Sequence, residues 1–195
     1  MRLVNNPVSA CLKAVIVPVV VFCLTCFLST PALAEESSLL VNKVKAAYVY
    51  NFCKFVEWPD AAFNNTDDTL SICILGDDPF GNLFDPVIGE PAQGKRIFIK
   101  RSKFAKAAKG CQIVFVCASE KDRLIPLLKS LAGTNILTVS DIDGFAEHGG
   151  MVGFYNADDR VRFKINLAAA QKAGLRFSSM IIEIATLVDE NHKRK

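Results

Sequence analysis

The residues that could carry chemistry are few in this chain and widely separated. The chain has two histidines: His148 lies in a glycine-rich loop, and His192 lies in a basic tail. Four cysteines follow residue 34, namely Cys53, Cys73, Cys111 and Cys117. No H-x-H, H-E-x-x-H or C-x-x-C pattern occurs beyond residue 34. Zinc and related metals need such ligand spacings, so the sequence predicts no metal site.

A catalytic constellation is also missing from the sequence. There is no G-x-S-x-G turn of the kind that carries a nucleophilic serine. Cys117 with His148 is a conceivable nucleophile and base, but a lone histidine in a glycine loop is more typical of a solvated residue. We therefore predict no catalytic residues, no cofactor and no enzyme activity.

The loop Gly76–Gly81, with the sequence GDDPFG, follows an apolar run and precedes a predicted helix. A phosphate loop offers bare backbone N–H groups at such a place, but the carboxylates of Asp77 and Asp78 would repel a phosphate. Asp78 instead suits the cap of its own helix. Because ligand crevices of open α/β sheets form at strand carboxyl ends, we expect Asp77 and Phe80 to face a cleft shared with Ser140–Asp141.

A row of basic residues alternates with apolar ones near the C-terminus. Arg160, Arg162 and Lys164 point one way in a strand, and Val161, Phe163 and Ile165 point the other way. A solvated strand face explains this row. As a functional surface it would suit a carboxylate ligand or an acidic patch on a partner protein.

The elements that position these residues can be predicted from apolar periodicity and turn residues. We expect strands at 70–75, 95–100, 112–117 and 136–139, followed by a hairpin of 151–155 and 160–165. We expect helices at 41–59, 78–87, 119–131, 167–173 and 178–188. This order predicts an α/β fold: a layered, mainly parallel sheet of about five to six strands, with helices on both faces and an antiparallel edge hairpin.

The first predicted helix, Val41–Pro59, is unusually aromatic. Its apolar residues recur at helical spacing, and Pro59 is expected to end it. Such a helix needs a large surface to pack on, which the sheet supplies. A second hypothesis is that its flank, Tyr50 and Trp58, also meets a ligand or a partner protein.

The first 34 residues are predicted to be a cleaved secretory signal. Ala14–Leu28 is an apolar stretch that is short for a membrane span, and Ala32–Ala34 matches an A-x-A cleavage site. Residues 35–195 then form a single domain with 21 basic and 20 acidic residues. This balance gives no indication of nucleic-acid binding. The C-terminal tail, His192–Lys195, is a basic run that a solvated C-terminus explains.

Four cysteines in an exported domain allow three complete disulfide pairings. Cys73 lies within the first predicted strand and Cys111 lies just before the third, and these two strands are neighbours in a sheet of the 2-1-3 type. A bond between them is one of the open possibilities. Cys53 and Cys117 lie on apolar faces, where buried free thiols are the simpler interpretation.

An ordered set of segments resembles the YfiR/HmsC-like family of exported proteins. The set includes Val44–Pro59, Ile74–Gly81, Leu137–Asp141, Gly149–Met151 and Arg160–Asn166, and it spans nearly all of residues 35–195. The resemblance implies a periplasmic protein that binds the sensor region of a membrane-bound diguanylate cyclase and holds it inactive. It also implies an outer-membrane lipoprotein as a second partner, a homodimer, and an output in cyclic di-GMP and biofilm.

The resemblance also bears on the cysteines. Cys73 and Cys111 match a disulfide of the family, so we expect them to pair. The family's second cysteine pair, around the glycine loop, has no counterpart within Phe145–Tyr155. An alternative to the inhibitory role is a periplasmic small-molecule sensor or binding protein with its ligand in the strand-end crevice.

Overall fold

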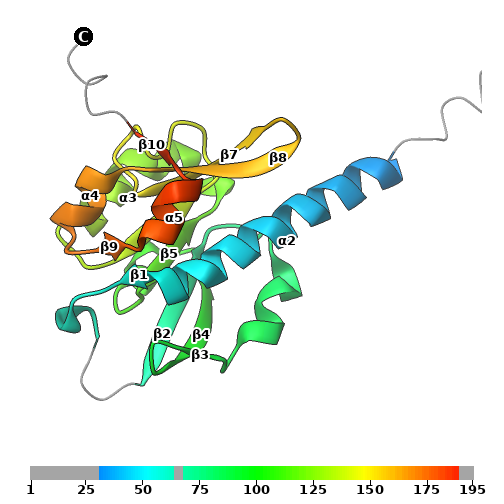
Figure 1. Ribbon diagram of the computed structural model, residues 1–195. Coiled ribbons are helices and arrows are strands. Elements are labelled where there is room, and N and C mark those ends of the chain that lie inside the picture. The colour runs from blue at the N-terminus through cyan, green and yellow to red at the C-terminus, as the bar shows by residue number, and fades with distance from the viewer. Residues whose placement is uncertain (1–30, 64–67, 189–195) are drawn as a thin grey trace, which may run out of the picture. The chain divides into compact units, whose positions relative to one another are not determined.

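The computed structural model describes residues 31–63 and 68–188 (Figure 1). The predicted signal peptide falls on residues outside these ranges, except for 31–34, which are helical backbone; the basic tail also lies outside them. The described chain divides into two units between Leu40 and Val41, and the sheet belongs to the unit that begins at Val41. Among the described residues, no helix combines the length and hydropathy that a membrane span requires.

An eight-stranded sheet organises the fold, with the strand order β10-β8-β7-β6-β5-β2-β4-β3. Neighbours from β4 through β2, β5 and β6 to β7 are parallel, whereas β8 is antiparallel to β7 and β3 is antiparallel to β4. The strands are β2 (Thr69–Leu75), β3 (Pro91–Ala92), β4 (Lys95–Ser102), β5 (Ile113–Val116), β6 (Leu137–Ser140), β7 (Val152–Ala157), β8 (Arg160–Ile165) and β10 (Thr186–Leu187).

This sheet confirms the predicted α/β fold. The β4-β2-β5 order is the expected 2-1-3 arrangement, and β7 and β8 form the expected antiparallel hairpin. The two-residue strands β3 and β10 raise the number above the five to six predicted. Two residues are too few to show an apolar alternation, so strands this short cannot be recognised from sequence.

One face of the sheet, which we call the α2 face, is covered by residues 41–55 of α2 (Pro31–Phe55) and by α5 (Ser179–Ile184) (Figure 1). Phe52 has no exposed surface, and its ring lies 5.5 Å from that of Phe163 on β8. Tyr48 contacts the same ring at 5.0 Å. Edge-to-face pairs of this kind add to the burial of large rings, so the aromatic helix does pack on the sheet as expected.

The end of α2 differs from the prediction. The helix stops at Phe55, and Val56–Glu57 form β1, which pairs antiparallel with β9 (Arg176–Phe177). The pairing of Val56 with Phe177 joins segments more than a hundred positions apart. Local periodicity cannot reveal a pairing between such distant segments, so the sequence predicted that the helix continues to Pro59.

The other face, which we call the α3 face, is covered by α3 (Leu124–Leu131) and by the 3-10 turn η3 (Ala105–Ala108). The predicted helix at 119–131 is split, because its first part is the 3-10 segment η4 (Ala118–Arg123). This places Pro126 in the first turn of α3, where a missing N–H does no harm. Pro126 therefore does not interrupt the helix.

Three shorter elements test the remaining predictions. The predicted helix at 78–87 is a 3-10 segment, η2 (Gly81–Val87), and Asp78 accepts a bond from the Phe80 N–H at 2.7 Å instead of capping an α-helix. The last helix ends at Ile184 and is followed by β10. The prediction for α4 (Leu167–Lys172) is confirmed: Asn166 Oδ1 accepts the Ala169 N–H at 2.9 Å. The remaining 3-10 turn is η1 (Asp60–Ala62).

Candidate functional site

The residues predicted to share a strand-end crevice do gather at the carboxyl end of the sheet, but they do not leave it open. Phe80 is only 2% exposed, and its ring lies 5.0 Å from Phe84 and 4.7 Å from Phe115. It is a core residue, and the expectation that it faces a cleft is wrong. Ser140 is also buried, where it donates a hydrogen bond to the carbonyl of Val116 at 2.6 Å.

Four carboxylates surround this end of the sheet, and each is held by a basic side chain. The pairs are Asp77–Lys103 (2.7 Å), Asp78–Arg101 (2.7 Å), Glu120–Arg123 (2.8 Å) and Asp141–Lys45 (2.6 Å). We call this set the strand-end ion pairs. No group of three or more His, Cys, Asp or Glu residues suited to a metal occurs among the described residues. The strand-end ion pairs form the rim of this end of the sheet.

Gly76 allows this rim to close. Its φ is 108°, in the region that favours glycine, and an added Cβ would lie 2.5 Å from Ser119 Oγ. The same hydroxyl accepts a hydrogen bond from the Asp77 N–H at 2.9 Å. The loop after β2 is thus bonded to η4 and is closed by its own contacts, in agreement with the argument against a phosphate loop.

The two flanking aromatics of the first helix have different environments. Trp58 is 9% exposed, and its indole N–H donates to the carbonyl of Gln112 at 3.2 Å. It belongs to the core and presents no contact surface. Tyr50 is half-buried, with the ammonium of Lys54 at 4.2 Å from its ring centroid, so Tyr50 alone of this pair stays a candidate contact.

The basic row on β8 is oriented as predicted. Phe163 and Ile165 are buried, whereas Arg160 and Arg162 are exposed. The Arg162 guanidinium lies 3.7 Å from the exposed carboxylate of Asp158. Lys164 differs from both arginines, because it reaches toward a cavity that the sequence did not reveal.

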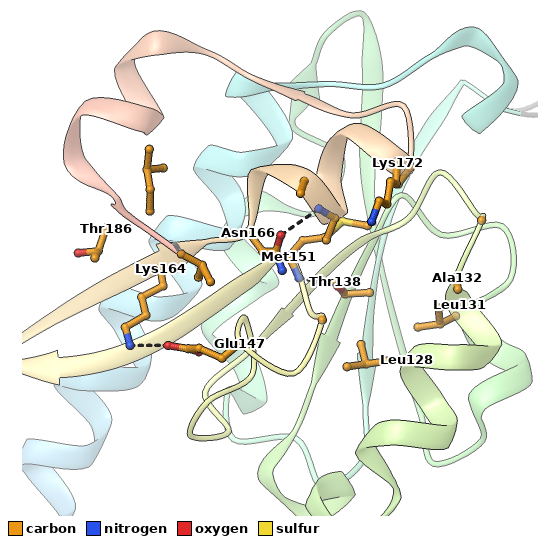
Figure 2. Close-up of a pocket in the computed structure, with 17 residues that line it drawn as sticks. Leu128, Leu131, Ala132, Thr138, Glu147, Met151, Lys164, Asn166, Lys172 and Thr186 are labelled. Carbon is orange, nitrogen blue, oxygen red and sulfur yellow. Dashed lines mark hydrogen bonds and ion pairs between the residues drawn. The ribbon is translucent and has the colours of Figure 1, made fainter. Parts of the chain in front are cut away.

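This cavity, of about 780 Å³, lies on the α3 face near the β8–β10 edge (Figure 2). The end of α3 forms one wall, and Lys164 and Thr186 lie across from it. Small and apolar residues form most of the lining: Leu128, Leu131, Ala132, Gly133, Gly149, Met151, Ala168, Ala169, Ala173, Leu187 and Val188. A concave, mainly apolar space of this size is typical of a small-molecule site.

The polar groups of the cavity are few, and most of them are already bonded. Lys164 Nζ donates to Glu147 Oε1 at 2.5 Å (Figure 2), and Asn166 uses both ends of its amide, donating to the Ala146 carbonyl at 2.9 Å. Thr138 Oγ1 accepts the Met151 N–H at 3.1 Å. Among the described residues, Lys172 has no ion-pair partner and is the free cation of the lining.

Glu147 is held in its charged form. Burial opposes ionisation, but the hydrogen bond from Lys164, a backbone hydrogen bond and the charges of Lys164 and His148 outweigh it. The pKa of Glu147 is therefore below its ordinary value. The only sequence signals for the cavity were two runs of small residues, Ala168–Ala170 and Gly149–Gly150. Small side chains can leave a cavity, but their sequence positions do not show where it forms.

The family model described as YfiR/HmsC-like matches residues 42–186, about three quarters of the sequence and most of the described part. The chain belongs to the YfiR/HmsC-like family. Membership suggests a regulatory, periplasmic role in diguanylate cyclase signalling. No curated protein is detectably similar to this YfiR/HmsC-like chain.

A more distant likeness exists among solved structures. The structure described as the ABC domain in complex with L-Trp from Streptococcus pneumoniae aligns with 9% identity and a TM-score of 0.46. The alignment covers 61% of this YfiR/HmsC-like chain and 55% of that chain. We draw no argument from it.

In this YfiR/HmsC-like protein, Cys73 and Cys111 lie together under the α3 face as reduced thiols. The hydrogen bond that Cys73 shares with Cys111, with burial, raises the pKa of Cys73. The same hydrogen bond lowers the pKa of Cys111, and Lys100 acts in the same direction. Both thiols belong to one buried cluster, and the disulfide between them stays a prediction.

Cys53 and Cys117 are buried free thiols. Burial raises the pKa of both to about 12, and the carboxylates of Asp78 and Asp141 add to this effect at Cys117. Thiols that remain protonated are poor nucleophiles. Cys117 is therefore a poor candidate for a nucleophile. The proposed base, His148, forms a hydrogen bond through Nδ1 with the Gly144 carbonyl at 2.6 Å.

Proposed function

We propose that this protein is a periplasmic inhibitor that binds the sensor region of an inner-membrane diguanylate cyclase and thereby lowers cyclic di-GMP and biofilm formation. The observation that carries the proposal is the family match over residues 42–186.

The proposal has three further parts. The chain reaches the periplasm through a signal peptide cleaved after Ala34, an outer-membrane lipoprotein relieves the inhibition by sequestering the protein, and the protein forms a homodimer. On the described surface, Tyr50, Asp77, Arg160 and Arg162 are exposed enough to contact a partner. Phe80 and Trp58 are excluded from that surface by their burial.

Deletion of the gene with measurement of cyclic di-GMP and surface attachment tests the inhibitory role. Both quantities should rise, and the full chain should restore them. The matched control is the same chain without residues 2–34, which remains in the cytoplasm and should not restore them. Restoration by this unexported chain would contradict a periplasmic site of action, and unchanged cyclic di-GMP after deletion would contradict the inhibitory role itself.

A partner experiment identifies the target. The exported protein, cross-linked in intact cells, should capture a membrane protein that carries a cyclase domain. Arg160→Glu with Arg162→Glu should weaken this capture if the basic row of β8 is part of the contact, whereas Lys121→Glu with Lys129→Glu, on η4 and α3, serves as the charge-matched control. N-terminal sequencing of the same sample shows whether the mature protein begins at Glu35.

A second candidate function is small-molecule sensing, which the cavity beside Lys164 and Lys172 favours. Its lining suits a small, mainly apolar molecule with one acidic group, and binding there would tune the protein contact. This site replaces the strand-end crevice, whose residues are already paired. A ligand should raise the melting temperature of the wild type, and Ala168→Leu, which fills the cavity, should abolish that rise. A rise that survives Ala168→Leu would place the ligand elsewhere.

A further inference from the structure

A long run of positive charge adjoins the strand-end ion pairs. Residues 95–109, KRIFIKRSKFAKAAK, contain seven basic side chains and no acidic one. Outside this segment the chain has 16 basic and 20 acidic residues, so the protein is electrically polarised. We call residues 95–109 the basic segment. A basic run longer than the C-terminal tail is therefore folded into the sheet and the turn that follows it.

The strand β4 gives the basic segment an outward-facing row. Ile97 and Ile99 are buried on the α2 face. Because side chains alternate along a strand, Arg96, Phe98 and Lys100 point to the opposite face. All three are exposed, and Phe98 has 52% of its surface open to solvent. On the side away from β2, β4 pairs only with the two-residue β3, so this row lies at an edge of the sheet.

The turn after β4 also carries exposed basic and aromatic side chains. Phe104 is 68% exposed, the largest exposure among the large apolar side chains described, and the Lys106 ammonium lies 5.8 Å from its ring centroid. Lys106 and Lys109 also line a recess of about 510 Å³ beside Ala105 and Cys111. The basic segment therefore presents two exposed phenylalanine rings, Phe98 and Phe104, among its cations.

Most of the cations in the basic segment are available to a partner. Arg101 and Lys103 are neutralised by Asp78 and Asp77 in the strand-end ion pairs. The other five have no ion-pair partner among the described residues: Lys95, Arg96, Lys100, Lys106 and Lys109. Four of these are exposed, whereas Lys95 is half-buried with its ammonium 4.6 Å from the centroid of the Phe63 ring. An occupant of this surface must therefore bring several negative charges and a place for aromatic rings.

We propose that the basic segment docks this protein on the surface of an anionic phospholipid membrane. Phosphate headgroups would contact the free lysines, and Phe98 and Phe104 would enter the interfacial layer. Five of the seven cations are lysines, and lysine is depleted at protein–protein interfaces but common in membrane-binding polybasic surfaces. This favours a lipid surface over an acidic protein. Docking would keep the protein close to a membrane-embedded partner, and it can be tested without one.

Vesicle flotation with protein purified from the periplasm tests the proposal directly. The protein should float with vesicles of phosphatidylglycerol and phosphatidylcholine and should not float with phosphatidylcholine alone. Binding should be lost in high salt, because the attraction is electrostatic. Lys106→Glu with Lys109→Glu should weaken binding by about 25-fold or more, since each basic group near an anionic surface contributes roughly fivefold.

Two matched variants make the result specific. Lys121→Glu with Lys129→Glu changes the net charge by the same amount on the exposed surface of η4 and α3, and it should leave binding within about twofold of the wild type. Phe98→Ser with Phe104→Ser should weaken binding to the anionic vesicles without changing net charge. Circular dichroism should show that every variant is folded.

Three outcomes would overturn the proposal. The first is no flotation with anionic vesicles. The second is equal loss of binding in both lysine pairs, which would show a response to net charge alone. The third is a wild type that ignores vesicles while Lys106→Glu with Lys109→Glu abolishes capture of the cyclase, which would make the basic segment a protein-docking surface. The first two outcomes do not depend on whether the protein binds or inhibits a cyclase, so the two proposals can fail separately.

Discussion

The ammonium nitrogen of Lys45 lies 2.6 Å from Oδ2 of Asp141, so an ion pair across 96 positions of sequence ties α2 to the loop after β6. The side chains are only 11% and 21% exposed, and Asp141 Oδ1 is buried without a hydrogen-bond partner. Lys45 is therefore the main compensation for a poorly solvated carboxylate. Removing one partner of such a pair leaves an uncompensated charge, which costs more than the pair itself contributes.

We predict that Lys45→Met lowers the free energy of unfolding by about 2 kcal/mol, somewhat less than for a fully buried pair. Urea denaturation at neutral pH measures it. Lys43→Met, at an exposed position on the same helix, should change stability by less than about 0.5 kcal/mol. The double variant Lys45→Met with Asp141→Asn should recover part of the loss. Equal stability of Lys45→Met and Lys43→Met would contradict this role for the ion pair.

The presence of Cys73 and Cys111 in one buried cluster leads to a redox prediction. Oxidation should form a disulfide that closes a span of 38 positions. The chain-entropy model then gives a stabilisation of about 4 kcal/mol, before any native-state strain. Unfolding of oxidised and reduced protein should differ by this order, and the double variant Cys73→Ser with Cys111→Ser should show no such difference. Four titratable thiols in air-oxidised protein from the periplasm would refute the pairing.

Thiol reactivity in the reduced protein should follow the pKa shifts. Cys111 has a lowered pKa and lines the recess beside Lys106 and Lys109, so it should be alkylated first. Cys53 and Cys117, with pKa values raised to about 12, should react only after denaturation. Mass spectrometry after brief iodoacetamide treatment identifies the modified residue. Modification of Cys117 ahead of Cys111 would show that the strand-end rim opens readily.

The ion pair between Lys164 and Glu147 should make a small contribution to acid stability. The pKa of Glu147 is lowered in the folded state, so its stabilisation is complete above the ordinary carboxyl pKa and is lost as the pH falls through the lowered one. Both side chains are more than a third exposed, which limits the contribution to under about 1 kcal/mol.

Lys164→Met should therefore reduce stability at neutral pH and flatten its decline between about pH 5 and pH 3. Urea denaturation across this range provides the test. Arg162→Met is the control, because the Arg162–Asp158 pair is longer and more exposed. A Lys164→Met profile that runs parallel to the wild type would argue against linkage through Glu147.

Much of the scaffold could be predicted from local patterns. The apolar runs of β2, β4, β5 and β6 predicted the bounds of these four strands to within one or two residues. Asn166 and Gly174 set the limits of α4, because the amide caps the first turn and the glycine adopts a φ of 73° at its end. These signals are readable because the groups that satisfy each other lie within a few positions.

The site was much less predictable. Phe80 was expected to face a cleft because it follows a strand end, and contact with a partner was the second hypothesis for Trp58. Each instead fills the core through partners more than 30 positions away. The cavity beside Lys164 is assembled from the ends of α3, β8 and α4, the glycine loop and β10, none of which carries a motif. Burial and concavity depend on how distant segments pack against each other, and this packing cannot be derived from local patterns in a single sequence.

The sequence by itself therefore determined the α/β order of elements, the family likeness and the lack of a catalytic motif, because all three reside in residue types and local spacing. Only the tertiary structure decided which charges are available. Asp77, Asp78 and Asp141 are neutralised by lysines and arginines from other elements. Five cations of the basic segment remain without such a partner among the described residues. Pairing depends on distance in space, since Coulomb attraction and hydrogen bonding act across contacts regardless of sequence separation.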